Sequence, residues 1–250
     1  MIKSLKKLLM RIIPQRMLGS DLSIKQRLTN LETLILALLD SPTYLASNDV
    51  GFNGQQFRKT IFKKLLCSYP FQTMVETGTC LGNTTGYMAE ISGLPVWSAE
   101  LDPRFAALAR KRLVRFSNVR IENIDSRAFL RDLVDINLHQ TFTFFYLDAH
   151  WNDDLPLREE VEFIAKKWSK FVIMVDDFAV PGDPGYKYDY YGLGMNLTPR
   201  YLNETLRRLD LIACYPLLSS DEESGAKRGC VVLTRNGGLA NTLISTGLFR

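Results

Sequence analysis

The 250-residue chain has few cysteines, and they are scattered along the sequence. Its four cysteines, Cys67, Cys80, Cys214 and Cys230, form no C-x-x-C motif. This absence argues against a disulfide framework, and scattered single cysteines are typical of reduced core residues in a cytosolic protein. The sequence therefore predicts a cytoplasmic location.

Long apolar runs, internal repeats and low-complexity segments are also missing. The chain should therefore contain no helix that spans a bilayer, and its length suits one α/β domain with extensions. The dinucleotide fingerprint G-x-G-x-x-G is absent as well, which argues against a nicotinamide dehydrogenase. Much of the net charge of +4 lies near the N-terminus, so no nucleic-acid surface is predicted.

The N-terminal segment has the pattern of a basic amphipathic helix. The apolar residues recur at helical spacing and would form one face: Ile2, Leu5, Leu8, Leu9, Ile12 and Ile13. The cations would form the other face: Lys3, Lys6, Lys7 and Arg11. The lysines interrupt the apolar core that a signal peptide needs. Such a helix packs on its own domain or on a second subunit, or it lies on an anionic membrane surface.

A second helix is predicted over residues 22–39, where apolar residues alternate by four and three. The run is too short to hold a coiled coil alone, so it indicates a dimer contact or a lid. We therefore expect a helical extension over residues 1–54 and a main domain over 55–250. Residues 1–40 would provide either a homodimer contact or peripheral contact with the inner face of the membrane.

The chain is organised around residues 73–85, where an apolar strand ends at Glu76 and a glycine turn follows. Gly78 and Gly82 flank this turn, and the polar residues after it are typical of a helix start. Glycine lets the backbone turn sharply, and the free N–H groups of a helix start attract an anionic group. The stretch therefore predicts a site for a ligand with a carboxylate or phosphate.

The rest of the chain repeats a strand–helix pattern and ends in a strand pair. Strands are expected over 73–76, 96–100, 119–123, 141–147, 171–175, 211–215 and 230–234, and helices over 56–67, 85–92, 104–114, 127–133, from 156 onward, and over 199–209. This alternation predicts an α/β fold with a doubly wound, mostly parallel Rossmann-like sheet of seven strands, the last antiparallel. Acidic residues end five of the strands: Glu76, Glu100, Asp125, Asp148 and the pair Asp176–Asp177.

Two of these acids have positions that suggest ligand contacts. Glu100 follows Gly82 by eighteen residues, near the place where a Rossmann-like fold holds ribose hydroxyls. Asp125 would lie beside the adenine, or it would cap the helix that follows, and the two roles are compatible.

Over roughly residues 55–235 the chain resembles the class I S-adenosylmethionine (SAM) methyltransferases. Glu76, Gly78 and Gly82 are similar to their motif I, although Cys80 stands where the middle glycine is usual. Asp148 followed by Asp176–Asp177 is similar to the metal-dependent O-methyltransferases of the macrocin (sugar) and catechol types. The resemblance implies SAM binding by Glu76, Thr77, Gly78, Thr79, Gly82, Asn83, Thr84, Glu100, Asp125, Ser126 and Asp148.

The same resemblance implies a metal site. Asp148, Asp176 and Asp177 would hold Mg²⁺, or Mn²⁺ or Ca²⁺, because carboxylate oxygens suit hard divalent cations. His150, two residues past Asp148, would act as base on an acceptor hydroxyl. The alternative is that Asp176 and Asp177 only cap a turn and that His150 is a packed core residue.

The sequence thus predicts a SAM-dependent, divalent-metal-assisted O-methyltransferase that acts on a hydroxyl of a small molecule, such as a sugar or another diol. Two alternatives stay open: a different enzyme of this fold, such as a cephalosporin-hydroxylase-like protein, and a non-catalytic SAM-fold interaction protein. The tyrosine-rich segment 180–195 is expected to be a mobile lid over the acceptor, or else an ordered loop packed on the core.

Overall fold

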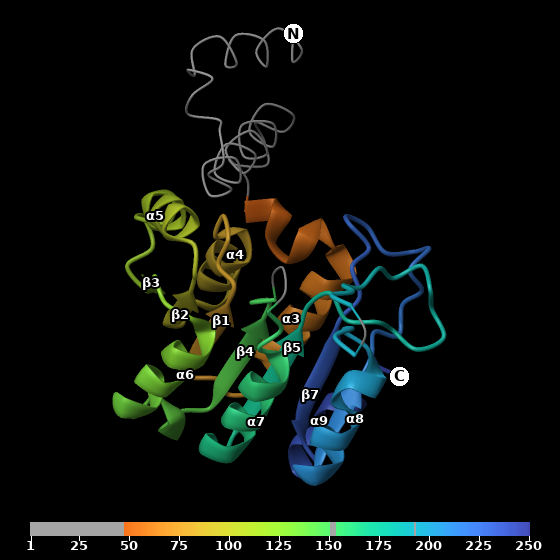
Figure 1. Cartoon of the computed structure of the whole chain (residues 1–250). Helices are drawn as coiled ribbons and strands as arrows, with labels where there is room; N and C mark the ends of the chain where they lie inside the picture. The colour runs from red at the N-terminus through yellow and green to blue at the C-terminus, as the bar shows by residue number, and fades with distance from the viewer. Residues whose placement is uncertain (1–47, 151–153, 193) are drawn as a thin grey trace, which may run out of the picture. The chain divides into compact units, whose positions relative to one another are not determined.

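The computed structural model describes residues 48–150, 154–192 and 194–250, which form one compact unit beginning at Asn48 (Figure 1). The two predicted N-terminal helices, with their membrane and dimer alternatives, lie outside the described residues. Within the described ranges no helix has the length and apolar character needed to cross a bilayer.

The compact unit begins at Asn48, and the predicted domain boundary between residues 54 and 55 stays a prediction. Asn48–Gly54 form a 3₁₀ segment, η3, that packs on helix α4 (Asn83–Ser92). Phe52 in this segment is fully buried, and its ring lies 5.1 Å from those of Phe62 and Tyr146. Because an aromatic side chain buries a large apolar surface, this residue fixes the segment to the main domain.

A seven-stranded sheet forms the centre of the unit, in the order β3-β2-β1-β4-β5-β7-β6. The strands are β1 (Thr73–Thr77), β2 (Val96–Ala99), β3 (Val119–Glu122), β4 (Thr143–Leu147), β5 (Phe171–Val175), β6 (Leu211–Cys214) and β7 (Val231–Arg235). Neighbours from β3 to β5 pair in parallel, whereas β7 pairs antiparallel with both β5 and β6. The predicted seven-stranded sheet with its last strand antiparallel is therefore confirmed.

Helices cover both faces of the sheet (Figure 1). They are α3 (Gln56–Ser68), α4, α5 (Pro103–Arg112), α6 (Ser126–Asp135), α7 (Leu157–Lys167), α8 (Pro199–Arg208) and α9 (Gly238–Ser245), with a short 3₁₀ turn, η4 (Leu138–Gln140). Successive strand residues point to opposite faces. Met74 accordingly packs in the core that includes residues of α3, α4 and α9, whereas Val75 packs in the core that includes residues of α6, α7 and α8.

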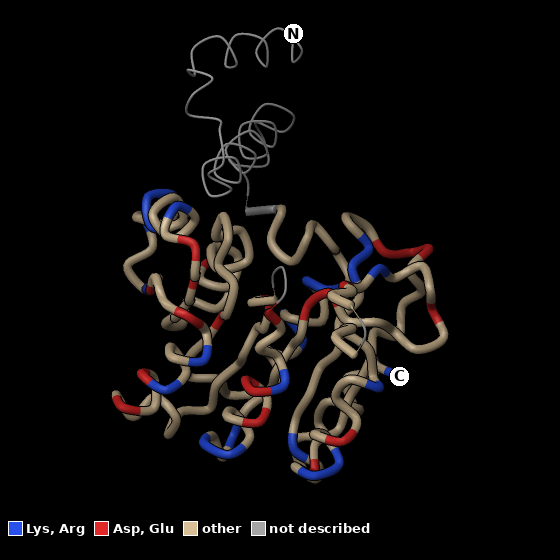
Figure 2. Tube along the Cα trace, viewed as in Figure 1, with Lys and Arg blue, Asp and Glu red and all other residues tan. Residues whose placement is uncertain are grey.

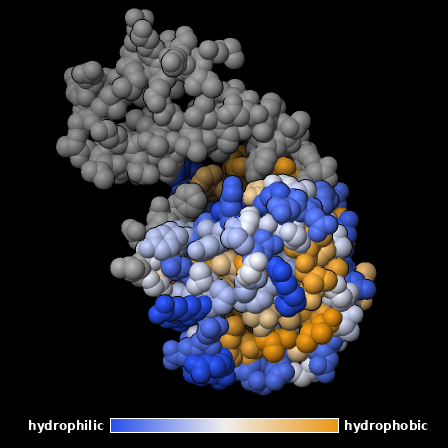
Figure 3. Space-filling model, turned by 90° about the vertical axis from the view of Figure 1, so that its right-hand side faces the viewer, coloured by the Kyte–Doolittle hydropathy of each residue, from blue (hydrophilic) through white to orange (hydrophobic). Residues whose placement is uncertain are grey.

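Helix α9 was not predicted from the sequence, because it begins with glycine and is only eight residues long. It buries Ala240 and Leu243. Figure 3 looks onto the side of the molecule that lies on the right in Figure 1, where apolar side chains gather among hydrophilic ones. Leu217 and Ile244, both from the C-terminal part of the chain, are among the exposed large apolar residues of the described unit.

Candidate active site

The predicted site residues follow the carboxyl ends of neighbouring strands. Thr77 of β1 is in register with Leu147 of β4, which is in register with Val175 of β5. The backbone N–H of Asp148 donates to Thr77 (2.9 Å), and that of Asp176 donates to Leu147 (3.0 Å). The parallel ladder therefore brings the residues after β4 and β5 beside the glycine turn that follows β1.

The glycine turn owes its composition to close packing against the neighbouring strand. Gly78 has φ +88°, and an added Cβ would lie 2.2 Å from the carbonyl oxygen of Asp148. Only glycine fits both the left-handed backbone and the short distance. Cys80 also has a positive φ, of +48°, where a non-glycine residue is uncommon. The turn is thus held tightly against the strand end that carries Asp148.

Glu76, the acid before the turn, is buried and forms hydrogen bonds with the elements around it. Its carboxylate accepts hydrogen bonds from the hydroxyls of Thr85 on α4 and Ser98 on β2, the latter at 2.5 Å. The Thr79 hydroxyl lies 2.5 Å from that of Ser98. Burial raises the pKa of Glu76 to about 7. Glu76 therefore stabilises the glycine turn by linking β1 to β2 and α4.

Glu100 lies at the end of β2 with its carboxylate against the turn. Its two oxygens accept from the backbone N–H of Cys80 (2.7 Å) and of Asp102 (2.8 Å). Burial raises its pKa, although these hydrogen bonds oppose the shift. Each carboxylate oxygen can accept a further hydrogen bond, so the residue retains the capacity to bind a vicinal diol.

The polar side chains at the start of α4 hold neighbouring segments. Asn83 accepts from the guanidinium of Arg112 on α5 (2.9 Å), and the Thr84 hydroxyl accepts from the backbone N–H of Phe52 (3.1 Å). The first-turn N–H groups of an α-helix have no acceptor within the helix. What the start of α4 offers an anion is therefore its backbone, whereas these two side chains are engaged elsewhere.

Asp125 caps α6, as one of its two predicted roles requires. Its carboxylate accepts from the backbone N–H of Arg127 (2.9 Å) and Ala128 (3.3 Å) and pairs with the Arg127 guanidinium at 2.8 Å. The hydrogen bond from the Arg127 side chain lowers the pKa of Asp125. Ser126 is buried as the first residue of the helix. The adenine contact proposed for both residues stays a prediction.

A three-residue cluster occupies the edge of the sheet beside the turn. Asp148, His150 and Asp177 each place one possible metal-ligand atom within 4.8 Å of the others. His150 Nε2 lies 3.5 Å from Asp148 Oδ1 and 3.7 Å from Asp177 Oδ2. It is buried and has no hydrogen-bond partner among the described residues. A buried, unpartnered ring nitrogen between carboxylates is a group that a ligand or a proton would satisfy.

Asp176 does not join this cluster, so the predicted trio Asp148, Asp176 and Asp177 is not assembled as expected. Its buried carboxylate is ion-paired with Arg58 of α3 and accepts from the Tyr146 hydroxyl and from Asn53 Nδ2, the last at 2.8 Å. Consecutive residues leaving a strand point to opposite faces, which turns Asp176 toward α3 and η3 and Asp177 toward His150.

Three further residues lie at the site: Asp189, Tyr191 and Arg228. The first two belong to the tyrosine-rich segment expected near the acceptor, but none of the three was predicted as a site residue. Arg228 donates to both Asp177 and Asp189. The single proton of the Tyr191 hydroxyl has two acceptors within reach, Asp189 Oδ2 (2.7 Å) and the backbone oxygen of His150 (3.2 Å). Asp189 Oδ2 lies 4.0 Å from His150 Nε2. None of these residues comes directly after a parallel strand, so the pattern of acids at strand ends could not predict them.

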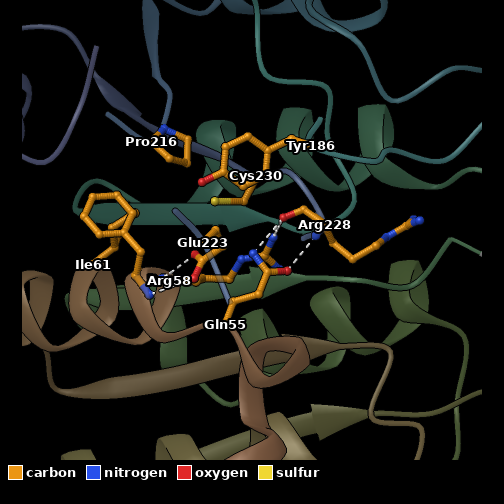
Figure 4. A pocket seen from close by; sticks show the side chains of 9 residues that line it. Gln55, Arg58, Ile61, Tyr186, Pro216, Glu223, Arg228 and Cys230 are labelled. Atoms are coloured by element: carbon orange, nitrogen blue, oxygen red, sulfur yellow. Dashed lines mark hydrogen bonds between the residues drawn. The ribbon is translucent and has the colours of Figure 1, made fainter. Parts of the chain in front are cut away.

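Figure 4 shows how Arg228 is positioned. Gln55, Arg58 and Arg228 lie side by side in a small pocket, and Gln55 exchanges two hydrogen bonds with the Arg228 backbone, at 2.7 and 2.9 Å. Arg58 donates to the same carbonyl oxygen. The start of α3 therefore fixes the residue whose side chain reaches Asp177 and Asp189.

The tyrosine-rich segment is joined to the rest of the unit by its backbone. The N–H of Asp189 donates to Asp177 (3.0 Å), that of Lys187 to Lys227 (2.9 Å), and that of Gly229 to Lys187 (2.8 Å). These contacts favour the ordered loop among the two sequence-based interpretations, and they bring Asp189 and Tyr191 to His150.

The pKa values of the two carboxylates in the cluster are shifted in opposite directions. Burial and the neighbouring Asp176 and Asp177 raise the pKa of Asp148 well above its usual range. Burial also acts to raise the pKa of Asp177, but the neighbouring His150 ring and the Arg228 guanidinium outweigh it and lower this pKa to about 2. About a third of the Asp148 side chain is exposed, whereas that of His150 is only 3% exposed. The cluster thus opens to solvent on the Asp148 side.

The chain matches no protein-family model and no curated protein sequence. Solved structures resemble it in fold. An O-methyltransferase from Bacillus cereus in complex with S-adenosylhomocysteine (SAH) has a TM-score of 0.54 and 16% identity, over 79% of this chain and 90% of that one.

The O-methyltransferase TomG from Streptomyces achromogenes, involved in tomaymycin synthesis and in complex with SAM, has a TM-score of 0.52 and 18% identity, over 72% of this chain and 80% of that one. With its seven-stranded sheet and this likeness, the described unit has the fold of the class I SAM-dependent methyltransferases.

Proposed function

We propose that this protein is a SAM-dependent O-methyltransferase that uses a divalent cation and acts on a hydroxyl of a sugar or another small diol. The observation that carries the proposal is the contact between the glycine turn and the acidic cluster. A Cβ added to Gly78 would lie 2.2 Å from the backbone oxygen of Asp148, whose side chain belongs to the cluster. A cofactor on the turn and an acceptor at the cluster would therefore be neighbours.

The residues around the turn suit SAM. Glu100 has a fixed carboxylate with acceptor capacity left for the two ribose hydroxyls. The start of α4 has backbone N–H groups for the carboxylate of the methionine moiety. Bound SAM supplies a methyl group on a positively charged sulfur, which an oxygen nucleophile can attack directly. The protein then has to align the acceptor and remove its proton.

The cluster suits a divalent cation with a changed set of ligands. Asp148 and Asp177 provide carboxylate oxygens, the donors that Mg²⁺ and Mn²⁺ prefer. Asp176 takes no part in this role because Arg58 already neutralises it. A bound cation would favour the ionised form of Asp148, whose pKa burial and neighbouring carboxylates raise.

His150 is proposed as the base. Its Nε2 is buried and points at the cluster without a hydrogen-bond partner, so its lone pair is free to take the proton of an acceptor hydroxyl. Asp177 and Asp189 would then stabilise the resulting imidazolium. Tyr191 holds the backbone of His150 and the carboxylate of Asp189 in their relative positions.

One observation favours a second candidate, an O-methyltransferase of the same fold that works without a metal. Arg228 already neutralises Asp177 and Asp189, so the repulsion that a cation would relieve is reduced. In that case Arg228 would lie beside the acceptor in place of the cation and stabilise its developing oxyanion.

Calorimetry with SAM, SAH and NAD tests the cofactor first, and binding of SAM and SAH but not NAD is expected. Transfer of a labelled methyl group to a panel of sugars and catechols then identifies an acceptor. With that acceptor, loss of transfer in excess chelator supports the metal-assisted reaction, and undiminished transfer supports the second candidate. Binding of SAM without transfer to any acceptor would favour a non-catalytic module.

A further inference from the structure

The charges of the main domain are distributed unevenly. Residues 1–47 contain seven Lys and Arg and three Asp and Glu, so the remaining 24 basic and 24 acidic residues of the chain's 31 and 27 cancel over residues 48–250. Residues 101–120 nevertheless contain six basic residues and a single acidic one, Asp102. This stretch includes α5 and the beginning of β3, the strand at one edge of the sheet.

Two of the six cations interact with polar side chains. Arg104 pairs with Asp102, and Arg112 donates to the backbone of Leu81 and to Asn83. The other four are exposed, and no described carboxylate lies within ion-pair distance of them: Arg110, Lys111, Arg115 and Arg120. We call these four residues the basic flank. Figure 2 shows basic residues gathered along α5.

The basic flank is combined with exposed apolar side chains. Val114, between Lys111 and Arg115 in the chain, is 83% exposed, and Leu101, just before α5, is 65% exposed. These values are the two highest among the exposed large apolar residues of the described unit. Both side chains flank α5, beside the exposed cations, and a surface that combines cations with exposed aliphatic side chains suits contact with lipid.

The basic flank is anchored to the domain by hydrogen bonds and packing. Arg110 Nε donates to the backbone oxygen of Ile121 on β3 (2.8 Å), and Leu113 and Ile121 share a small core with Ala109. The guanidinium groups of Arg115 and Arg120 lie over the rings of Phe116 and Trp97, at 4.8 and 4.9 Å. Because Ile121 packs on the α5 side, the adjacent Arg120 points to the other face of β3, and the cations border this edge strand on both sides.

We propose that the flank formed by α5 and β3 docks on an anionic lipid surface. The four cations would lie at the phosphate level of the headgroups, and Leu101 and Val114 would enter the acyl boundary. A nucleic acid would use the cations but would leave both aliphatic side chains in water. Leu101 directly follows Glu100, so its entry into the bilayer would bring the carboxyl end of β2 close to the membrane. The inference is independent of the proposed catalytic function.

Co-sedimentation of the full chain with phosphatidylcholine vesicles, with and without phosphatidylglycerol, tests the proposal. Binding is expected only with the anionic lipid. The triple variant Lys111→Glu/Arg115→Glu/Arg120→Glu should bind at least tenfold more weakly, since each cation near an anionic surface contributes measurably. Val114→Asp should weaken binding as well while leaving all cations in place.

The matched control is Lys166→Glu/Lys167→Glu/Lys170→Glu, which makes the same charge change at three exposed lysines around the end of α7. It should retain vesicle binding. Circular dichroism and SAH affinity check that both triple variants are folded. Equal vesicle binding by the two triple variants, or tighter binding of the wild type to duplex DNA than to anionic vesicles, would overturn the proposal.

Discussion

The carboxylate of Asp176 is ion-paired with the guanidinium of Arg58, 118 residues earlier in the chain, and both side chains are only 1% exposed. This pair joins α3 to the end of β5. It removes Asp176 from the acidic cluster and leaves Asp177 as the residue that faces His150. Through Arg58 it also helps to hold the backbone of Arg228.

Removing one partner of this pair should destabilise the protein. Arg58→Ala would leave the Asp176 carboxylate buried without its cation, and we expect the free energy of unfolding to fall by about 3–5 kcal/mol. Urea denaturation measures this. Arg208→Ala, which breaks the exposed pair with Glu162, is the control and should change stability by no more than about 1 kcal/mol. Similar losses in the two variants would contradict the assigned role.

Glu76 should make stability depend on pH. Its pKa in the folded protein, about 7, lies above its ordinary value of 4.5, so its protonated form is favoured by folding. The contribution is complete below about pH 4.5 and is lost as the pH rises through 7. The difference corresponds to about 3 kcal/mol.

Glu76→Gln removes this titration. Between pH 5 and pH 8, the free energy of unfolding of the wild type should therefore fall relative to that of Glu76→Gln. Glu160, also raised by burial to a pKa of about 7, is present in both proteins and cancels in the comparison. Parallel pH profiles for the two proteins would show that Glu76 is not perturbed.

Gly78 should tolerate no side chain. In Gly78→Ala the new Cβ would lie 2.2 Å from the Asp148 backbone oxygen at φ +88°, so the turn must move. Gly93→Ala is a matched control, because Gly93 also has a positive φ, +65°, but nothing lies within 4 Å of the added atom. We expect Gly78→Ala to lose at least about 2 kcal/mol more than Gly93→Ala in thermal or urea unfolding, and to bind SAH more weakly. Equal losses would mean that the close approach to Asp148 is not restrictive.

Glu100 should determine the affinity for the ribose. Glu100→Ala removes both carboxylate oxygens, and loss of a charged hydrogen-bonding partner costs about 1.5–3 kcal/mol. Calorimetry with SAH on the folded variant should show a corresponding drop in affinity. An unchanged Kd would place the ribose elsewhere.

The positions of the strands along the chain and the acids at their ends could be predicted from the sequence, because apolar runs followed by turn residues mark buried parallel strands. The same pattern placed Glu76, Glu100 and Asp148 at one edge of the sheet. It treated Asp176 and Asp177 as equivalent. Their separation depends on the side of the strand end to which each points and on the presence of Arg58 across the core.

The residues missed by the sequence analysis act over long distances in the chain. Arg228 reaches Asp177 from 51 residues away and Asp189 from 39 residues away, and Asp189 lies in a loop whose path no periodic pattern describes. Phe52 lies in an irregular segment, so its burial depends on the aromatic core around Phe62 and not on any local spacing. Contacts of this kind are determined by the tertiary structure alone.

Manganese binding tests the central claim most directly. With SAH present, electron paramagnetic resonance of Mn²⁺ should show one bound ion per wild-type chain. Asp177→Asn should weaken that binding at least tenfold, whereas Asp183→Asn, which alters a carboxylate paired with Arg250, should leave it unchanged. His150→Gln should retain most of the affinity, as expected of a base and not of a ligand. Absence of bound Mn²⁺ in the wild type, or equal binding by Asp177→Asn, would contradict the proposed site.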